Sequence, residues 1–228
     1  MGRRRVVIVC AVILSVLLHH SIAYCVRDKA RGILDHDYFA MQADTEDPHS
    51  RWLVNDIERN HLDKAILYTR QGRLKEAIND CVYLLQRLVN HPKGLAVFGM
   101  VAKLAKQPSL PLKFYENALR LYPEYAITHA QYGKYLAEIG NPKAGMQRLK
   151  RAIEIDPKLQ VSYTWLAEIY MKNGQAALAK KTLLEGKQAR MMKTDTAEKN
   201  GQEGKDPMQN TDGTSSADDD LLEFNAQP

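Results

Sequence analysis

The chain has 228 residues, of which 45% are hydrophobic and 26% are charged, and its formal net charge is +5. This composition is that of a folded domain and excludes a fibrous or wholly disordered chain. The charge is uneven, because residues 24–191 carry 26 Lys and Arg against 18 Asp and Glu, whereas residues 192–228 carry 3 against 9. The basic residues are scattered rather than gathered into a patch, so we expect no binding of nucleic acid.

The N-terminal residues have the pattern of a targeting segment. Residues 3–5 are arginines, residues 6–18 form an apolar run broken only by a serine, and residues 21–23 form a small-x-small site. These features are typical of a secretory signal peptide, which predicts that residues 1–23 are cleaved off and that the protein is exported. Residues 6–26 are also just long enough to span a bilayer, so an uncleaved membrane anchor remains the alternative.

The three cysteines allow more than one interpretation. Cys10 lies within the signal, which leaves Cys25 and Cys81 as a pair that could form a disulfide in an oxidising compartment. Against this, Cys81 occupies an apolar position of an expected helix, where cysteine behaves as a small hydrophobic residue. Cys25 could instead carry a lipid, although the large Tyr24 before it departs from that pattern.

Residues 24–57 are expected to form an N-terminal extension. Pro48 lies in a polar loop, and Ser50 is the expected N-cap of a helix that runs through Trp52 and Ile57 to Leu62. We expect this helix to join the leading helix of the segment that follows and to shield its open end.

The next segment is organised by a period of 34 residues. Gly72, Lys106, Gly140 and Gly174 lie at this spacing, and each separates two stretches with helical periodicity. A repeated unit of helix, tight turn and helix is therefore predicted, because glycine suits the left-handed residue that ends a helix. Lys106 is the exception, and the prolines that follow it predict a different and longer turn in the second unit.

Further positions keep the same phase. Small residues stand five positions beyond three of the turns, at Ala77, Gly145 and Ala179, where they allow two antiparallel helices to approach closely. Pro123 and Pro157 are also 34 residues apart and end the second and third units, because proline stops a helix.

The pattern resembles that of the tetratricopeptide repeat family. The third unit contributes His129, Tyr132, Gly133, Leu136, Gly140, Leu149, Ala152 and Pro157, and the fourth contributes Tyr163, Leu166, Ala167, Tyr170, Gly174, Ala179 and Leu183. The resemblance covers residues 58–191. It weakens in the second unit, which lacks the turn glycine, and in the first, where Pro92 comes three residues late. It implies an all-α fold, a right-handed α-solenoid of about four helix-turn-helix units.

By the same resemblance, the leading helices line a concave groove that binds a segment of a protein partner. The residues expected there are Leu62, Ile66, Arg70, Ala96, Met100, Lys103, Ala130, Lys134, Ala137, Thr164, Glu168 and Met171. The paired lysines and asparagines with which some members grip a terminal carboxylate have no counterpart at Leu62, Ile66, Ala96 and Met100, so we expect apolar anchoring steered by Lys103 and Lys134.

The implied function is a non-catalytic scaffold or assembly factor, similar to bacterial periplasmic members of the family in pilus or cytochrome assembly. The alternative is an accessory subunit of an enzyme or secretion complex, held by an N-terminal anchor in the inner membrane. We expect no cofactor and no metal, because the histidines at positions 36, 49, 61, 91 and 129 are isolated and are expected to be solvated or capping residues.

Residues 192–228 are expected to be disordered, because they are polar, acidic and poor in large apolar residues. The exception is the segment 218–224, Asp-Asp-Asp-Leu-Leu-Glu-Phe. It is either an inert end or a segment that binds a partner or the groove of the repeats.

Overall fold

The computed structural model describes residues 35–44 and 46–191. The predictions made for the signal peptide or anchor, for Cys25 and for the acidic tail fall outside these residues. The described helices are α2 (Tyr38–Ala43), α3 (Pro48–Ile57), the π-helix η1 (Glu58–Leu62), α4 (Asp63–Arg70), α5 (Leu74–Arg87), α6 (Pro92–Leu104), α7 (Leu112–Leu121), α8 (Ala126–Glu138), α9 (Pro142–Ile155), α10 (Gln160–Lys172) and α11 (Ala176–Met191).

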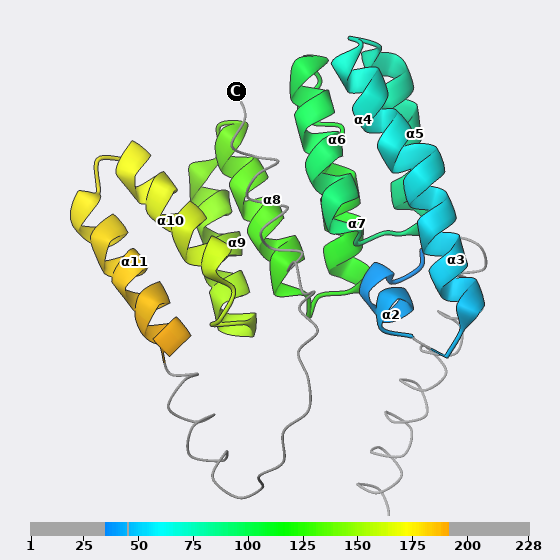
Figure 1. Ribbon diagram of the computed structural model, residues 1–228. Coiled ribbons are helices and arrows are strands. Elements are labelled where there is room, and N and C mark those ends of the chain that lie inside the picture. The colour runs from blue at the N-terminus through cyan, green and yellow to red at the C-terminus, as the bar shows by residue number, and fades with distance from the viewer. Residues whose placement is uncertain (1–34, 45, 192–228) are drawn as a thin grey trace, which may run out of the picture.

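The fold is an all-α solenoid. The helices follow one another in antiparallel pairs, α4 with α5, α6 with α7, α8 with α9 and α10 with α11, from the cyan end to the orange end of the molecule (Figure 1). This confirms the fold class predicted from the 34-residue period. None of the described helices is long and apolar enough to cross a membrane.

The four turns share one backbone conformation. Gly72, Lys106, Gly140 and Gly174 all have positive φ, at 72°, 56°, 94° and 74°. In each turn the N–H of the next residue donates to the carbonyl oxygen four residues before the turn residue, at 2.8 Å. This bond satisfies a carbonyl that the end of the helix would otherwise leave unpaired. The predicted different conformation at Lys106 is therefore wrong.

The predicted greater length of the second turn is confirmed. Helices α5, α9 and α11 begin two residues after their turn residue, whereas α7 begins at Leu112, six residues after Lys106. Pro108 and Pro111 lie in the additional turn, and Pro111 directly precedes the helix. Proline lacks the N–H that a helix interior requires, so α7 starts only after the second proline.

Small residues lie where the two helices of a unit cross. Ala77 and Ala179 are buried at 0% and 1% exposure. A Cβ atom on Gly145 would lie within 3.2 Å of the backbone and side chain of Ala137 on the facing helix. The prediction that small side chains permit close approach is confirmed at these three positions.

The first unit begins with one long helical run. Helix α3 continues through η1 into α4 without a break, which confirms that the N-terminal helix joins the first leading helix (Figure 1). The N-cap is Asp47, whose carboxylate accepts from the N–H groups of His49 and Ser50 at 2.9 and 3.2 Å. The prediction of Ser50 as the cap is wrong. Proline is tolerated at the first helical position because the N–H that it lacks would have no partner there. The helix therefore begins at Pro48, with Asp47 before it as the N-cap.

Residues 35–43 do not cover the open end of the solenoid. They run along the connections between its first three units and form a strap, a name used below for this segment. The His36 N–H donates to the Arg87 carbonyl at 2.7 Å, and the Tyr125 hydroxyl donates to the Asp37 carboxylate at 2.7 Å. The Phe39 ring stacks on Tyr125 with centroids 4.5 Å apart.

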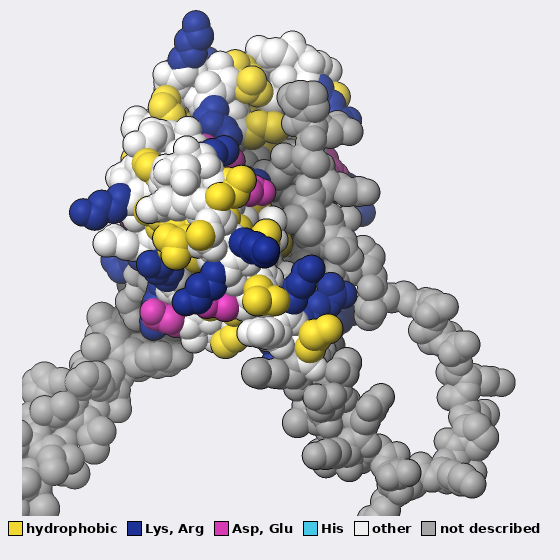
Figure 2. Space-filling view, turned by 90° about the vertical axis from the view of Figure 1, so that its left-hand side faces the viewer, with side chains coloured by type: hydrophobic (Ala, Val, Ile, Leu, Met, Phe, Trp, Pro, Cys, Tyr) yellow, Lys and Arg dark blue, Asp and Glu magenta, His cyan; other side chains and the backbone are white. Residues whose placement is uncertain are grey.

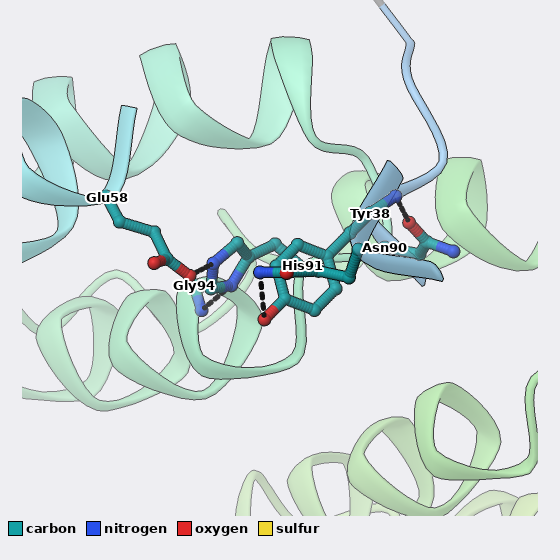
Figure 3. Close-up of polar contacts among 6 residues, drawn as sticks. Tyr38, Glu58, Asn90, His91 and Gly94 are labelled. Carbon is teal, nitrogen blue, oxygen red and sulfur yellow. Dashed lines mark hydrogen bonds and ion pairs between the residues drawn. The ribbon is translucent and has the colours of Figure 1, made fainter. Parts of the chain in front are cut away.

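A polar cluster fixes the strap to the loop before α6 (Figure 3). The Tyr38 N–H donates to the Asn90 side chain at 2.8 Å, and the Tyr38 ring lies 4.3 Å from the His91 ring. His91 is buried at 1% exposure, and its Nδ1 accepts from the Gly94 N–H at 3.0 Å. Nε2 therefore carries the proton and donates to Glu58 at 2.8 Å.

Candidate functional site

The leading helices α6, α8 and α10 enclose a hollow, called here the groove. It is lined by Ala96, Gly99, Met100 and Lys103 of α6, Tyr115 of α7, Gln131, Lys134, Tyr135 and Glu138 of α8, and Trp165 of α10. Its walls thus combine a flexible thioether, three aromatic rings and two lysines. The volume of this hollow is about 40 Å³, because the rings that line it are themselves buried.

Ion pairing sets the charge of the groove. Lys103 forms an ion pair with Glu138 across α6 and α8, and their side chains are 40% and 29% exposed. The Lys134 ammonium lies 4.7 Å from the centroid of the Trp165 ring, within cation–π distance. Burial lowers the pKa of Lys134, while the carboxylates of Glu138 and Glu168 act in the opposite direction.

The groove extends from α8 to the far end of α10. A second hollow of about 230 Å³ is lined by Lys134, Ala137, Glu138, Gly140 and Pro142 on one side and by Trp165, Glu168, Ile169, Lys172 and Asn173 on the other. This volume is below the roughly 300–1,000 Å³ of typical small-molecule sites. It matches single side chains of a partner better than a cofactor. Lys134, Glu138 and Trp165 line both hollows, which therefore adjoin.

The structure brings together part of the predicted groove. Ala96, Met100, Lys103 and Lys134 line the first hollow. Ala137, Glu168 and again Lys134 line the second. Arg70, Thr164 and Met171 are exposed and Ile66 is half-buried, but they line neither hollow.

Two predicted groove residues are buried in the core. Ala130 is 0% exposed and belongs to the same buried cluster as Trp165. Trp165 occupies the position that Gln131 and Val97 hold in the preceding units, and it adds a large ring to this cluster. Leu62 is 3% exposed and packs into the core of the first two units, apart from the groove.

Sequence reasoning missed the aromatic and acidic lining. Tyr135, Glu138 and Trp165 were assigned no role, although all three line the groove. A signal existed for one of them. Glu138 lies 35 residues after Lys103, close to one repeat, so the two residues lie at nearly the same height on adjacent leading helices, where opposite charges attract.

Three of the described histidines bond different partners. Among the described residues, no group of three or more His, Cys, Asp or Glu side chains is placed to hold a metal ion. His91 caps α6, as predicted, but it also bonds Glu58. His61 bonds Asp80 at 2.8 Å, and buried His129 bonds the Pro123 carbonyl at 3.0 Å. These two residues are neither solvated nor capping, so that prediction is wrong for them.

Cys81 has the environment of a core residue. It is 1% exposed and forms no disulfide with a described residue, and its alternative partner Cys25 lies outside the described residues. Burial, aided by the nearby Asp80 carboxylate, raises the pKa of this thiol to about 12.

Comparison with protein families agrees with the repeating geometry. Residues 149–181 match the model of a tetratricopeptide repeat. The match spans the end of α9, all of α10 and the start of α11, and the same pairing and turn recur at 34-residue intervals through the rest of the described chain. Residues 149–181 therefore hold a tetratricopeptide repeat. This agrees with the resemblance inferred from the sequence for the fourth unit.

Solved structures that resemble this chain include MamA and PilF. MamA has 15% identity over 68% of this chain and 85% of its own, with a TM-score of 0.46. MamA from Desulfovibrio magneticus RS-1 has 17% identity over 56% and 72%, with a TM-score of 0.44. PilF from Pseudomonas aeruginosa has 18% identity over 60% and 63%, with a TM-score of 0.46. A comparison with curated proteins gives no match.

Proposed function

We propose that this protein is a non-catalytic scaffold that binds a segment of a protein partner in the groove between α6, α8 and α10. The observation that carries the proposal is the pair of adjoining hollows around Lys134 and Trp165. Solenoids of stacked helix pairs bind partners on such extended surfaces.

The groove selects for apolar side chains with acidic neighbours. Met100 and the rings of Tyr135 and Trp165 offer apolar contacts, and an unbranched thioether adapts to different side chains. Among the described residues, no carboxylate lies within ion-pair distance of the Lys134 ammonium. A carboxylate of the partner would therefore gain a new ion pair there, beside the ring of Trp165.

Photo-crosslinking tests where the partner binds. A benzophenone side chain introduced at Met100 should crosslink a partner in cells, whereas the same group at exposed Lys150 on the outer helix α9 should not. Mass spectrometry of the crosslinked product then identifies the partner and the segment that contacts the groove. Crosslinking from Lys150 alone would place the binding surface on the outer helices and contradict the proposal.

Charge reversal tests the steering role. Lys103→Glu with Lys134→Glu should weaken binding of the identified segment by about tenfold or more and reduce its salt dependence. Lys143→Glu with Lys150→Glu on α9 changes the net charge equally and should leave binding within twofold. Equal effects of the two double variants would show that only the overall charge matters, which would rule out steering by the groove.

We also propose export from the cytoplasm, on the basis of the basic and apolar pattern of residues 1–23. N-terminal sequencing of the native protein tests this. A chain that begins at Tyr24 supports a cleaved signal, an intact N-terminus in the membrane fraction supports the anchor, and a blocked, lipidated Cys25 supports a lipoprotein. An intact N-terminus in the cytosol would contradict export.

A further inference from the structure

Among the described helices, α11 lacks the next-unit neighbour that α5 and α9 have. Helix α5 packs against α6 of the next unit, and α9 packs against α10. Helix α11 packs against α10 of its own unit, and no described helix follows it. Its buried face consists of the small residues Ala179, Thr182 and Gly186. The opposite side of α11 therefore occupies the position at which a further repeat would stack.

This outer face of α11 carries apolar and basic side chains together. It consists of Ala177, Lys180, Leu183, Leu184 and Lys187, which are all exposed. Apart from the adjacent pair Leu183 and Leu184, successive members are three residues apart, so they share one side of the helix. Leu183 is 45% exposed and Leu184 is 55% exposed. Figure 2, which views the molecule from the α11 side, shows hydrophobic side chains interspersed with Lys and Arg there.

The residues that directly follow α11 are unsuited to cover this face. One period after α10, the next leading helix would occupy residues 194–206. The positions that hold Leu166 and Tyr170 in α10 would hold Asn200 and Gly204. These residues lack the large apolar side chains with which a leading helix packs against its neighbour.

A complementary segment lies further along the same chain. Residues 218–224 read Asp-Asp-Asp-Leu-Leu-Glu-Phe, so three large apolar residues are combined with four carboxylates. They are the only such cluster in residues 192–228, where 9 acidic residues outnumber 3 lysines. We propose that the outer face of α11 binds residues 218–224 of its own chain, with the apolar side chains on Leu183 and Leu184 and the carboxylates beside Lys180 and Lys187.

The chain is long enough for this contact. Residues 192–217 connect α11 to the segment, and a chain of this length can span at most about 85–95 Å. Helix α11, with 16 residues, is about 24 Å long. The segment can therefore reach any point of the outer face. A tether of this kind gives an effective concentration on the order of 1 mM, so even a weak contact is largely formed.

A synthetic peptide tests the contact without interference from the chain's own segment. The full chain with Leu221→Asp and Leu222→Asp leaves the outer face open to a fluorescein-labelled peptide of residues 215–228. Fluorescence anisotropy should then give a Kd below about 1 mM that rises with salt concentration. Adding Leu184→Asp should weaken binding about tenfold. Leu104→Asp is the matched control, because Leu104 on α6 is also 55% exposed, and it should leave binding within twofold.

Three results would overturn the proposal. The first is the absence of peptide binding up to 1 mM. The second is peptide binding that is abolished by Lys103→Glu with Lys134→Glu but not by Leu184→Asp. This result would place the segment in the groove. The third is a dimer of the unmodified chain, measured by sedimentation, that Leu184→Asp dissociates but the double variant Leu221→Asp with Leu222→Asp leaves intact. In that case a second copy of the chain, and not its own segment, would cover α11. A melting temperature measured for each variant verifies that it is folded.

Discussion

Gly133 on α8 and Gly145 on α9 are in backbone contact. A Cβ atom on Gly145 would lie 2.5 Å from the Gly133 carbonyl oxygen, and one on Gly133 would lie 2.7 Å from the Gly145 carbonyl oxygen. Backbone atoms cannot rotate aside as the end of a side chain can. The crossing of these two helices, which carry Lys134 and the wall of the groove, therefore depends on two glycines.

Gly145→Ala should lower the free energy of unfolding by about 1–3 kcal/mol, because the helices must move apart to admit one methyl group. Urea denaturation measures this loss. Gly99→Ala is the comparison, because its Cβ would meet ring atoms of Tyr135 at 3.0 Å, and a ring can shift. An equal or smaller loss for Gly145→Ala would show that the α8–α9 crossing is loose.

Lys106→Gly should stabilise the protein. A left-handed conformation costs a non-glycine residue about 1–2 kcal/mol, and part of this gain is lost because glycine makes the unfolded chain more flexible. The expected net gain is about 0.5–1 kcal/mol in thermal or urea unfolding. The adjacent Gln107→Gly serves as the control and should be destabilising, since Gln107 does not have positive φ. If both substitutions stabilise the protein, the gain comes from glycine anywhere in this loop and not from relief of the left-handed conformation at Lys106.

Glu58→Ala should destabilise the junction between the first two units by about 1–3 kcal/mol, because it leaves the buried Nε2–H of His91 without an acceptor. Glu58→Gln retains an oxygen acceptor and should cost less. The two variants are compared by urea denaturation at neutral pH. If they lose the same free energy, the hydrogen bond to His91 contributes nothing and only the charge or the packing of Glu58 matters.

Cys81 should resist alkylation in the folded protein. With a pKa of about 12, only about one thiol in ten thousand is ionised at pH 8, and the thiolate is the reactive form. In a Cys10→Ser, Cys25→Ser background, iodoacetamide should react with Cys81 only after unfolding. The raised pKa also implies that the free energy of unfolding falls above about pH 9, where the unfolded thiol loses its proton and the folded one does not. Rapid alkylation of the native protein would contradict the burial of Cys81.

The repeats were predictable from the sequence because their determinants are local and periodic. A left-handed turn favours glycine and a close crossing favours small residues, and both requirements recur every 34 residues, at Gly140 and Gly145 for example. Lys106 shows the limit of this reasoning. The hydrogen bond from Gln107 to the Ala102 carbonyl stabilises the same turn without a glycine, at the expense of backbone strain.

The groove was only partly predictable, because its lining depends on the sizes of neighbouring residues. Position 130 was expected to face the groove, but Ala130 is fully buried in a cluster that includes Trp165 of the next unit. The Trp165 side chain also lines both hollows. A period identifies equivalent positions, whereas exposure at each of them is decided by contacts with residues that differ from unit to unit.

The strap changes how this solenoid is expected to fold. In a simple array of repeats each unit contacts only its neighbours, so unfolding can begin at either end and proceed unit by unit. Here the Asp35 carbonyl oxygen accepts a hydrogen bond from the hydroxyl of Tyr122, 87 residues later in the chain. The Asp37 carboxylate accepts one from the hydroxyl of Tyr125, 88 residues later. These bonds form only when the chain has been synthesised as far as the start of the third unit. The first three units are thereby joined into one cooperative block, and the pair α10 and α11 is left as the part that frays first.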